Sequence, residues 1–229
     1  MLKRTALVVT LSASVGWLCL QTQVDVREGL PPPASQTRHW SVIRGCPDAL
    51  ADAYYFPIGT FSPLAGTPSS EDDVRRRWYA KHLRALEQAS LICGPAPATA
   101  YRFTYLRSFH RPIVVQVDVS QDRQRWLSAW EANGAGGYEP GEVIRRLRRL
   151  LAPQEWADLQ RRLAAADVCT LDASKASNAH DGASWVVEVK ERGSYCAVAR
   201  QSPKDATLRA LGLFFIEASG FVERSEEVY

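Results

Sequence analysis

Apolar residues recur with two different periods along this chain, and the period of two is clearest near its end. In the segment 183–190 the apolar residues of one face are Trp185, Val187 and Val189. Alternation of this kind is typical of a strand with one buried face. A second apolar run, 195–200, follows a turn in which Gly193 can adopt a positive φ. The pattern predicts an antiparallel hairpin.

Further strands are indicated upstream of this hairpin. In YRFTYLR, at 101–107, three aromatic residues alternate with other residues, and IVVQVDV, at 113–119, is rich in β-branched side chains. The segment 125–131 is a third candidate, with two tryptophans on one face. The segment 142–151 fits either a helix face or an edge strand, because its apolar residues are separated by four arginines.

Helical spacing of apolar residues predicts three helices, at 69–93, 153–167 and 203–219. The first has Ser69 or Ser70 as its N-cap and an acidic first turn. The second opens at Pro153. For the third, Ser202 is the expected N-cap, Pro203 the first helical residue and Gly220 the stop.

These elements predict an α+β fold, an antiparallel sheet of about five or six strands covered by about three helices. We expect one domain at 40–229, in which 40–100 is a helical and aromatic lead-in and 101–221 is the sheet-containing core. The aromatic loop at 48–65 is expected to carry a small core of its own rather than a ligand groove. An apolar fraction of 46% is ordinary for a chain with one sizeable core.

The first 22 residues predict export, as a signal peptide or an N-terminal anchor. Lys3 and Arg4 precede an apolar run from Ala6 to Leu20, which is short for a membrane span. Cleavage, retention as an anchor and lipidation at Cys19 stay open, although the residues before Cys19 form a poor lipidation motif. A proline-rich linker at 23–39 follows. The expected location is periplasmic or secreted, with membrane contact only through an uncleaved leader.

Export changes how the cysteines are interpreted. Apart from Cys19 there are four, Cys46, Cys93, Cys169 and Cys196. An even number in an exported chain predicts two disulfides, and proximity favours Cys46–Cys93 and Cys169–Cys196. No pair has the spacing of a zinc site, and no cofactor is expected.

Chemistry-bearing residues are few. There is no GxSxG serine elbow and no GxGxxG or P-loop pattern, although Gly134, Gly136 and Gly137 form a glycine-rich turn. The catalytic candidates are His180, Asp181, Glu188 and His110. Possible anion-binding residues are Arg145, Arg146, Arg148 and Arg149.

Two functions follow as hypotheses. The first is a non-catalytic exported module that binds another macromolecule of the cell envelope, such as an inhibitor-type module. The alternative is an envelope hydrolase or other enzyme that uses His180, Asp181 and Glu188. A net charge of only +3 and the expected export argue against nucleic acid as the partner.

The segments YRFTYLRSFHRPIVVQV, GAGGYEPG, LAPQEWADLQRRLAAAD, HDGASWVVEV and LGLFFIEASG together resemble a set of uncharacterised bacterial exported proteins. The resemblance covers about Tyr101 to Phe221. It implies the order of elements, and it favours a strand over a helix after GAGGY, at 142–151. No activity comes with it.

Overall fold

A computed structural model describes residues 41–42, 55–62, 66–93, 96–172 and 182–222 of the 229. The chain divides after Ser35, and the second unit, Gln36–Tyr229, contains every element described below. The prediction of an α+β fold is confirmed: in the described residues, one antiparallel sheet combines with three α-helices.

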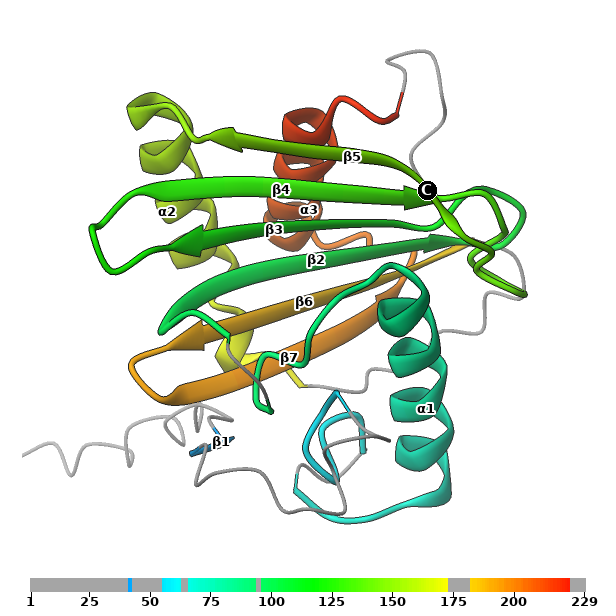
Figure 1. Cartoon of the computed structure of the whole chain (residues 1–229). Coiled ribbons are helices and arrows are strands. Elements are labelled where there is room, and N and C mark those ends of the chain that lie inside the picture. The colour runs from blue at the N-terminus through cyan, green and yellow to red at the C-terminus, as the bar shows by residue number, and fades with distance from the viewer. Residues whose placement is uncertain (1–40, 43–54, 63–65, 94–95, 173–181, 223–229) are drawn as a thin grey trace, which may run out of the picture. The chain divides into compact units, whose positions relative to one another are not determined.

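The sheet has the strand order β1-β7-β6-β2-β3-β4-β5, and each neighbouring pair is antiparallel (Figure 1). Its strands are β1 (Ser41–Val42), β2 (Thr99–Arg107), β3 (Ile113–Val119), β4 (Arg125–Ala132), β5 (Val143–Leu150), β6 (Ala183–Glu191) and β7 (Ser194–Gln201). β1 contributes only two residues. Strands β2 to β5 form a meander, and the β6–β7 hairpin joins it through the pairing of β6 with β2.

One face of the sheet is covered by α2 (Pro153–Ala166) and α3 (Ala206–Ser219) (Figure 1). The core between them includes Phe103, Tyr105, Trp185 and Phe215, none of which is exposed to solvent. Trp185 contacts the rings of Phe103 and Tyr105 edge-on, at centroid distances of 5.2 and 5.6 Å. Trp185 thus lies on a buried face, as its alternation with Val187 and Val189 predicts, and it packs against Gly212 of α3.

The other face of the sheet is covered by α1 (Ser70–Ala85) and by residues of the aromatic loop. Phe56 and Phe61 are fully buried against Tyr79 of α1, with ring centroids 5.0 to 6.2 Å apart. The predicted small core of the loop is therefore present in its described part.

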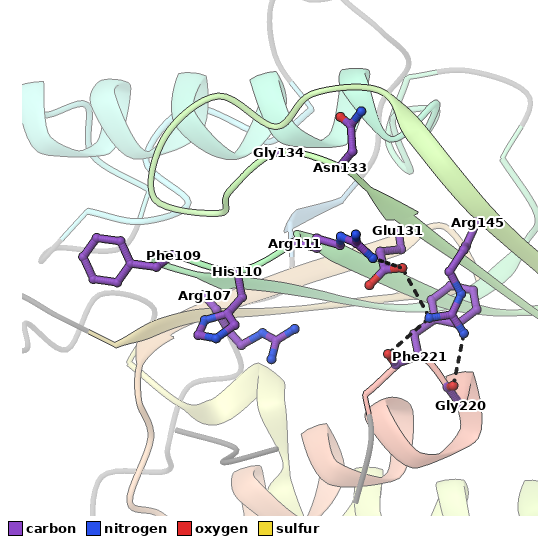
Figure 2. A pocket seen from close by; sticks show the side chains of 10 residues that line it. All are labelled: Arg107, Phe109, His110, Arg111, Glu131, Asn133, Gly134, Arg145, Gly220 and Phe221. Atoms are coloured by element: carbon purple, nitrogen blue, oxygen red, sulfur yellow. Dashed lines mark hydrogen bonds and ion pairs between the residues drawn. The ribbon is translucent and has the colours of Figure 1, made fainter. Parts of the chain in front are cut away.

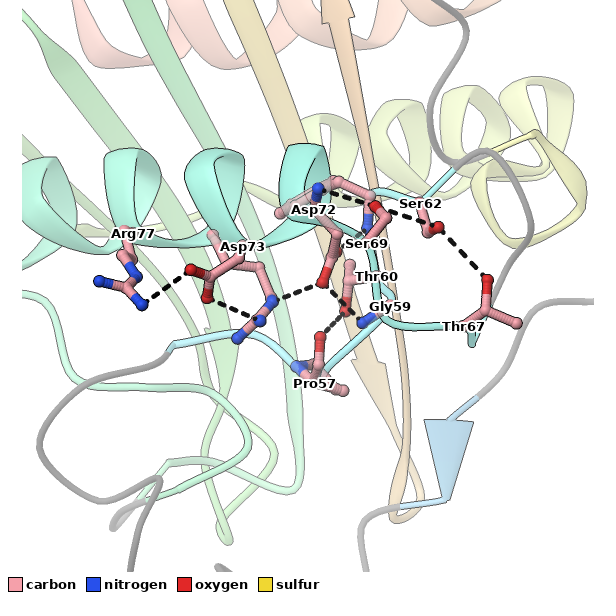
Figure 3. Close-up of polar contacts among 11 residues, drawn as sticks. Pro57, Gly59, Thr60, Ser62, Thr67, Ser69, Asp72, Asp73 and Arg77 are labelled. Atoms are coloured by element: carbon pink, nitrogen blue, oxygen red, sulfur yellow. Dashed lines mark hydrogen bonds and ion pairs between the residues drawn. The ribbon is translucent and has the colours of Figure 1, made fainter.

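Asp72 fastens this loop to α1, as Figure 3 shows. Its buried carboxylate accepts hydrogen bonds from the backbone N–H groups of Gly59 at 2.8 Å and Phe61 at 2.7 Å. It also accepts one from Arg76 Nε at 2.7 Å. A charged acceptor with three donors stabilises the loop more than neutral hydrogen bonds would.

Asp72→Asn is expected to lower the free energy of unfolding by about 1.5–3 kcal/mol, because hydrogen bonds to a charged group lose their acceptor charge. Urea denaturation measures this. The matched control is Asp73→Asn. The Asp73 side chain is 35% exposed and pairs with Arg76 and Arg77, so this substitution should lower the free energy of unfolding by less than about 1 kcal/mol. Equal losses at the two positions would contradict the assigned role.

Two predicted helix boundaries are wrong. The first helix ends at Ala85 rather than at residue 93, because Glu87 adopts a left-handed conformation with φ of 58° and the chain turns. The last helix begins at Ala206 rather than at Pro203. Asp205 is the N-cap and accepts hydrogen bonds from the N–H groups of Thr207 and Leu208. Ser202 instead accepts one from the Ala183 N–H.

The ambiguous segment 142–151 is a strand, β5, at one edge of the sheet. The turn of the closing hairpin is also as predicted, with positive φ at Arg192 and Gly193, the combination that suits a two-residue hairpin turn. The other predicted strands are found within one or two residues of their expected ends.

The predicted bridge between Cys169 and Cys196 is present, with Cα atoms 5.6 Å apart and within the usual span of a disulfide. Cys169 lies in the short helix η2 (Val168–Thr170), directly after α2, and Cys196 faces the same core from β7. Cys93 is also disulfide-bonded. Cys46 lies outside the described residues, so the pairing Cys46–Cys93 stays a prediction.

The variant Cys169→Ala/Cys196→Ala is expected to lose about 3–4 kcal/mol of unfolding free energy, because the bridge closes a loop of 27 residues in the unfolded chain. Urea denaturation with and without reductant provides the measurement. If reductant lowers the unfolding free energy of the variant further, that decrease is due to the disulfide at Cys93. A loss below about 1 kcal/mol without reductant would contradict the stabilising role.

Candidate functional site

A pocket of about 550 Å³ opens at one end of the sheet, where β2 and β4 end, β5 begins and α3 terminates (Figure 2). Four separate elements thus supply its walls. Its lining residues are Arg107, Phe109, His110, Arg111, Glu131, Asn133, Gly134, Arg145, Gly220 and Phe221.

The glycine-rich turn of the sequence forms one side of this region. The N–H of Gly136 donates to the carbonyl of His110 at 2.9 Å, and that of Gly137 donates to the carbonyl of Ser108 at 3.1 Å. A Cβ at Gly136 would lie 2.6 Å from the backbone of Leu106. Glycine is required at this position because the two backbone segments are in contact. The N–H groups of Gly136 and Gly137 are used in this packing and do not form a phosphate-binding loop.

This close approach places two exposed aromatic side chains together. Phe109 is 63% exposed and Tyr138 is 58% exposed, and their ring centroids lie 5.9 Å apart. Phe109 also lines the pocket. Paired aromatic rings left in water on a hydrogen-bonded loop are typical of a surface that another molecule covers.

Among the described residues that line the pocket, arginines outnumber acidic residues. Three arginines line it, against one glutamate and one histidine. Glu131 is 3% exposed and lies between Arg145, at 3.3 Å from Nη1 to Oε2, and Arg111, at 3.9 Å (Figure 2).

Arg145 also holds the end of α3 against the sheet. Its guanidinium donates to the carbonyl oxygens of Gly220 and Phe221, both at 3.4 Å, and lies 4.3 Å from the centre of the Phe221 ring. A cation at a helix C-terminus complements the helix dipole. Through these contacts, Arg145 holds Phe221 in place at the edge of the pocket.

Of the predicted site residues, the structure brings His110 and Arg145 together in the pocket. The other three arginines of β5 have separate partners. Arg146 pairs with Glu87 at 2.5 Å, Arg149 pairs with Glu155 at 2.6 Å, and Arg148 lies 4.5 Å from the Trp126 ring. Successive residues of a strand face opposite ways, so the four do not form one patch.

The enzyme hypothesis requires a Glu188 side chain that a substrate can reach, but this side chain is buried. It forms a two-pronged ion pair with Arg102, at 2.5 and 2.7 Å, and accepts a hydrogen bond from the Tyr195 hydroxyl at 2.9 Å. Arg102 and Glu188 are both 0% exposed. Burial raises the pKa of Tyr195, and the charge of Glu188 raises it further, so the hydroxyl remains a donor. His180 and Asp181 lie outside the described residues.

Sequence reasoning missed Arg107, Arg111, Glu131 and the aromatic pair. A signal was present: in LRSFHRP, three basic residues surround Phe109 just before Pro112, where a strand ends and a loop begins. The contact of this segment with the glycine-rich turn could not be read from spacing, because 21 residues that include two strands separate the two segments.

No protein-family model, curated protein or solved structure matches the chain. The resemblance to uncharacterised exported proteins thus stays a prediction that rests on the segments quoted above. In the described part of the chain, no helix has the length and apolar character of a membrane span. The same residues contain no group of three or more His, Cys, Asp or Glu arranged to hold a metal ion.

Proposed function

We propose that this protein is an exported, non-catalytic module that binds another macromolecule of the cell envelope, and that it does so through the arginine pocket and the Phe109–Tyr138 pair. The observation that carries the proposal is the pair itself, held in water beside a charged pocket. Interfaces concentrate their binding energy in such aromatic and arginine residues.

Export is the second part of the proposal. The basic and apolar pattern of the first 20 residues supports it, and so does the bridge Cys169–Cys196, because stable disulfides are rare in reducing compartments. N-terminal sequencing of protein from its native source should find a mature chain starting between about residues 19 and 30 if the leader is removed. A cytosolic pool that retains Met1 would contradict export.

The alternative, an envelope hydrolase or other enzyme, has less support. Its candidate Glu188 is engaged by Arg102 and Tyr195 in the interior, where a substrate cannot reach it. His110 is the one described catalytic candidate that lines the pocket.

A photoreactive residue tests the binding function directly. Benzoylphenylalanine at position 138, in place of an exposed tyrosine, is expected to cross-link one discrete partner when the protein is irradiated in its native compartment. The same residue at position 123, in the turn at the opposite end of the sheet, is the control. Equal cross-linking from both positions, or none from position 138, would contradict the proposal.

A further inference from the structure

We infer that the outer edge of β5 binds an extended segment of the partner protein, which joins the sheet as one further strand with an acidic residue opposite Arg148. This inference rests on the proposed binding function and names the mode of recognition. β5 is the outermost strand at its edge of the sheet (Figure 1), and Arg145, near its start, lines the pocket. One partner can therefore reach both the pocket and the edge.

The outer edge of β5 carries backbone groups that no described residue uses. Just past the strand, the N–H of Leu151 donates to the carbonyl of Arg125 at 2.8 Å, so the backbone of Leu151 faces β4. Backbone groups of successive residues point to opposite sides of a strand, and those of Arg146 and Arg148 therefore point away from β4. Within the described ranges, neither the N–H nor the C=O of either arginine is hydrogen-bonded.

A polypeptide segment is the ligand that matches this edge. Donors and acceptors alternate along it, and a second extended backbone satisfies both kinds of group, which is how strand addition provides affinity. The phosphodiester groups of a nucleic acid only accept hydrogen bonds, so they would leave the two carbonyl oxygens without donors. The alternating groups therefore identify a protein as the partner.

Side chains along the edge specify the segment. Leu150 is 54% exposed, and Arg146 and Arg148 are exposed on the same face of the strand. Arg146 pairs with Glu87 at 2.5 Å. Arg148 instead lies over the Trp126 ring and forms no ion pair with a described residue. Since opposite residues of paired strands are in contact, the segment should place an apolar residue against Leu150 and an acid against Arg148.

The charges around Arg148 favour this acid. Arg146 and Glu87 form a pair, whose opposite charges largely cancel for a group outside it. Asp118 of β3 is a second acid near Arg148: burial raises the pKa of its carboxyl, and the charge of Arg148 is among the effects that lower it. An acid on the added strand would lie one strand from Arg148 and three strands from Asp118. Attraction would thus exceed repulsion about threefold, because Coulomb energy falls inversely with distance.

A second copy of this chain fits the edge less well. Two β5 edges paired with Leu147 opposite Leu147 would set Arg146 of one copy against Arg148 of the other. Like charges directly opposite each other destabilise a sheet, so the arginines protect this edge from pairing with itself. They leave it open to a segment of opposite charge.

Amide hydrogen exchange, followed by NMR on the full folded chain, tests the backbone pairing. The probe is the peptide TVTETTT with blocked ends, which in the antiparallel direction places Val opposite Leu150 and Glu opposite Arg148. The outward amides of Arg146 and Arg148 should exchange about threefold more slowly at a peptide concentration of about twice the Kd, because only free protein exchanges. The amides of Leu147 and Arg149, which face β4, should be unaffected.

Matched variants separate charge from backbone. The lysine peptide TVTKTTT should bind at least about twofold more weakly than TVTETTT, and Arg148→Glu should reverse this order. Arg148→Thr and Arg148→Pro both remove the charge, but only proline removes the outward N–H, and an edge strand tolerates proline there. Proline should therefore weaken binding of TVTETTT about threefold beyond threonine.

Benzoylphenylalanine at position 150 extends the test to the native compartment. It replaces the exposed leucine of the edge and should cross-link the same partner as position 138. The exchange measurement on the unsubstituted chain accompanies it and requires no variant to fold.

Several results would overturn the inference. They are unchanged exchange with the acidic peptide, equal binding of the lysine peptide, equal effects of proline and threonine at position 148, and no cross-link from position 150. Outward amides that are already slow in the free chain, or that slow as protein concentration rises, would also overturn it. If these tests fail while position 138 still cross-links, the binding function survives and only the edge is wrong. If position 138 also fails, the function itself is contradicted.

Discussion

Replacing Arg102 with methionine is expected to lower the free energy of unfolding by about 3–5 kcal/mol, the usual cost of leaving one member of a buried ion pair without its partner. The reason is the environment of Glu188, which is 0% exposed and would keep only the Tyr195 hydroxyl among its donors on neighbouring strands. Arg102 Nη1 also donates to the carbonyl of Ala89 at 2.7 Å, so the turn after α1 would lose a tether.

A comparison of single and double variants separates the charge from the packing. Arg102→Met/Glu188→Met removes both charges and is expected to be more stable than Arg102→Met alone, since apolar replacements of a buried pair are often tolerated. Arg102→Lys keeps the charge but loses the two-pronged geometry, and it should fall between the two. Urea denaturation provides all four free energies. A double variant less stable than the single one would show that the pair is not the source of the loss.

Trp185→Ala is expected to cost about 3–5 kcal/mol, the usual range when a large buried aromatic residue is truncated. The ring fills the space between β6 and α3, where a Cβ at Gly212 would lie 2.0 Å from it. The contact between Gly212 and Trp185 also provides a control, because Gly212→Ala is expected to change stability in opposite directions with and without the Trp185 ring. Gly212→Ala should destabilise the native protein by overpacking, yet it should stabilise the Trp185→Ala variant by filling part of the cavity.

Thermal or urea unfolding of the four proteins measures this cycle. The sign reversal is the decisive result, because helix propensity alone would make Gly212→Ala stabilising in both backgrounds. A loss below about 1 kcal/mol for Trp185→Ala would contradict the central position of the ring.

Most of the sheet could be predicted from the sequence because its strands alternate strongly, as in 183–190. The edge strand at 142–151 was ambiguous, since four arginines interrupt its apolar residues and both periods fit. Helix ends were less predictable. Ser202 and Asp205 are both good caps, and the choice between them depends on the Ala183 N–H that Ser202 binds, a contact between distant segments.

The burial of both sheet faces was not predictable. Arg102 and Glu188 alternate with the apolar residues of their strands, and charge at such positions normally marks a solvent-facing side. Only their pairing across β2 and β6 allows them to be buried. The candidate site was missed for a related reason: its residues come from four elements, and their proximity depends on the strand order.

The position of β6 has a consequence for how this chain folds. The meander of β2 to β5 can form from neighbouring segments, but its pairing with β6 must wait for residues about 86 positions further along. Contacts between such distant segments slow folding, because the loop must close first. Until then β2 presents an unpaired edge to other chains. We therefore expect the slowest step, and the greatest tendency to aggregate, before the last hairpin docks.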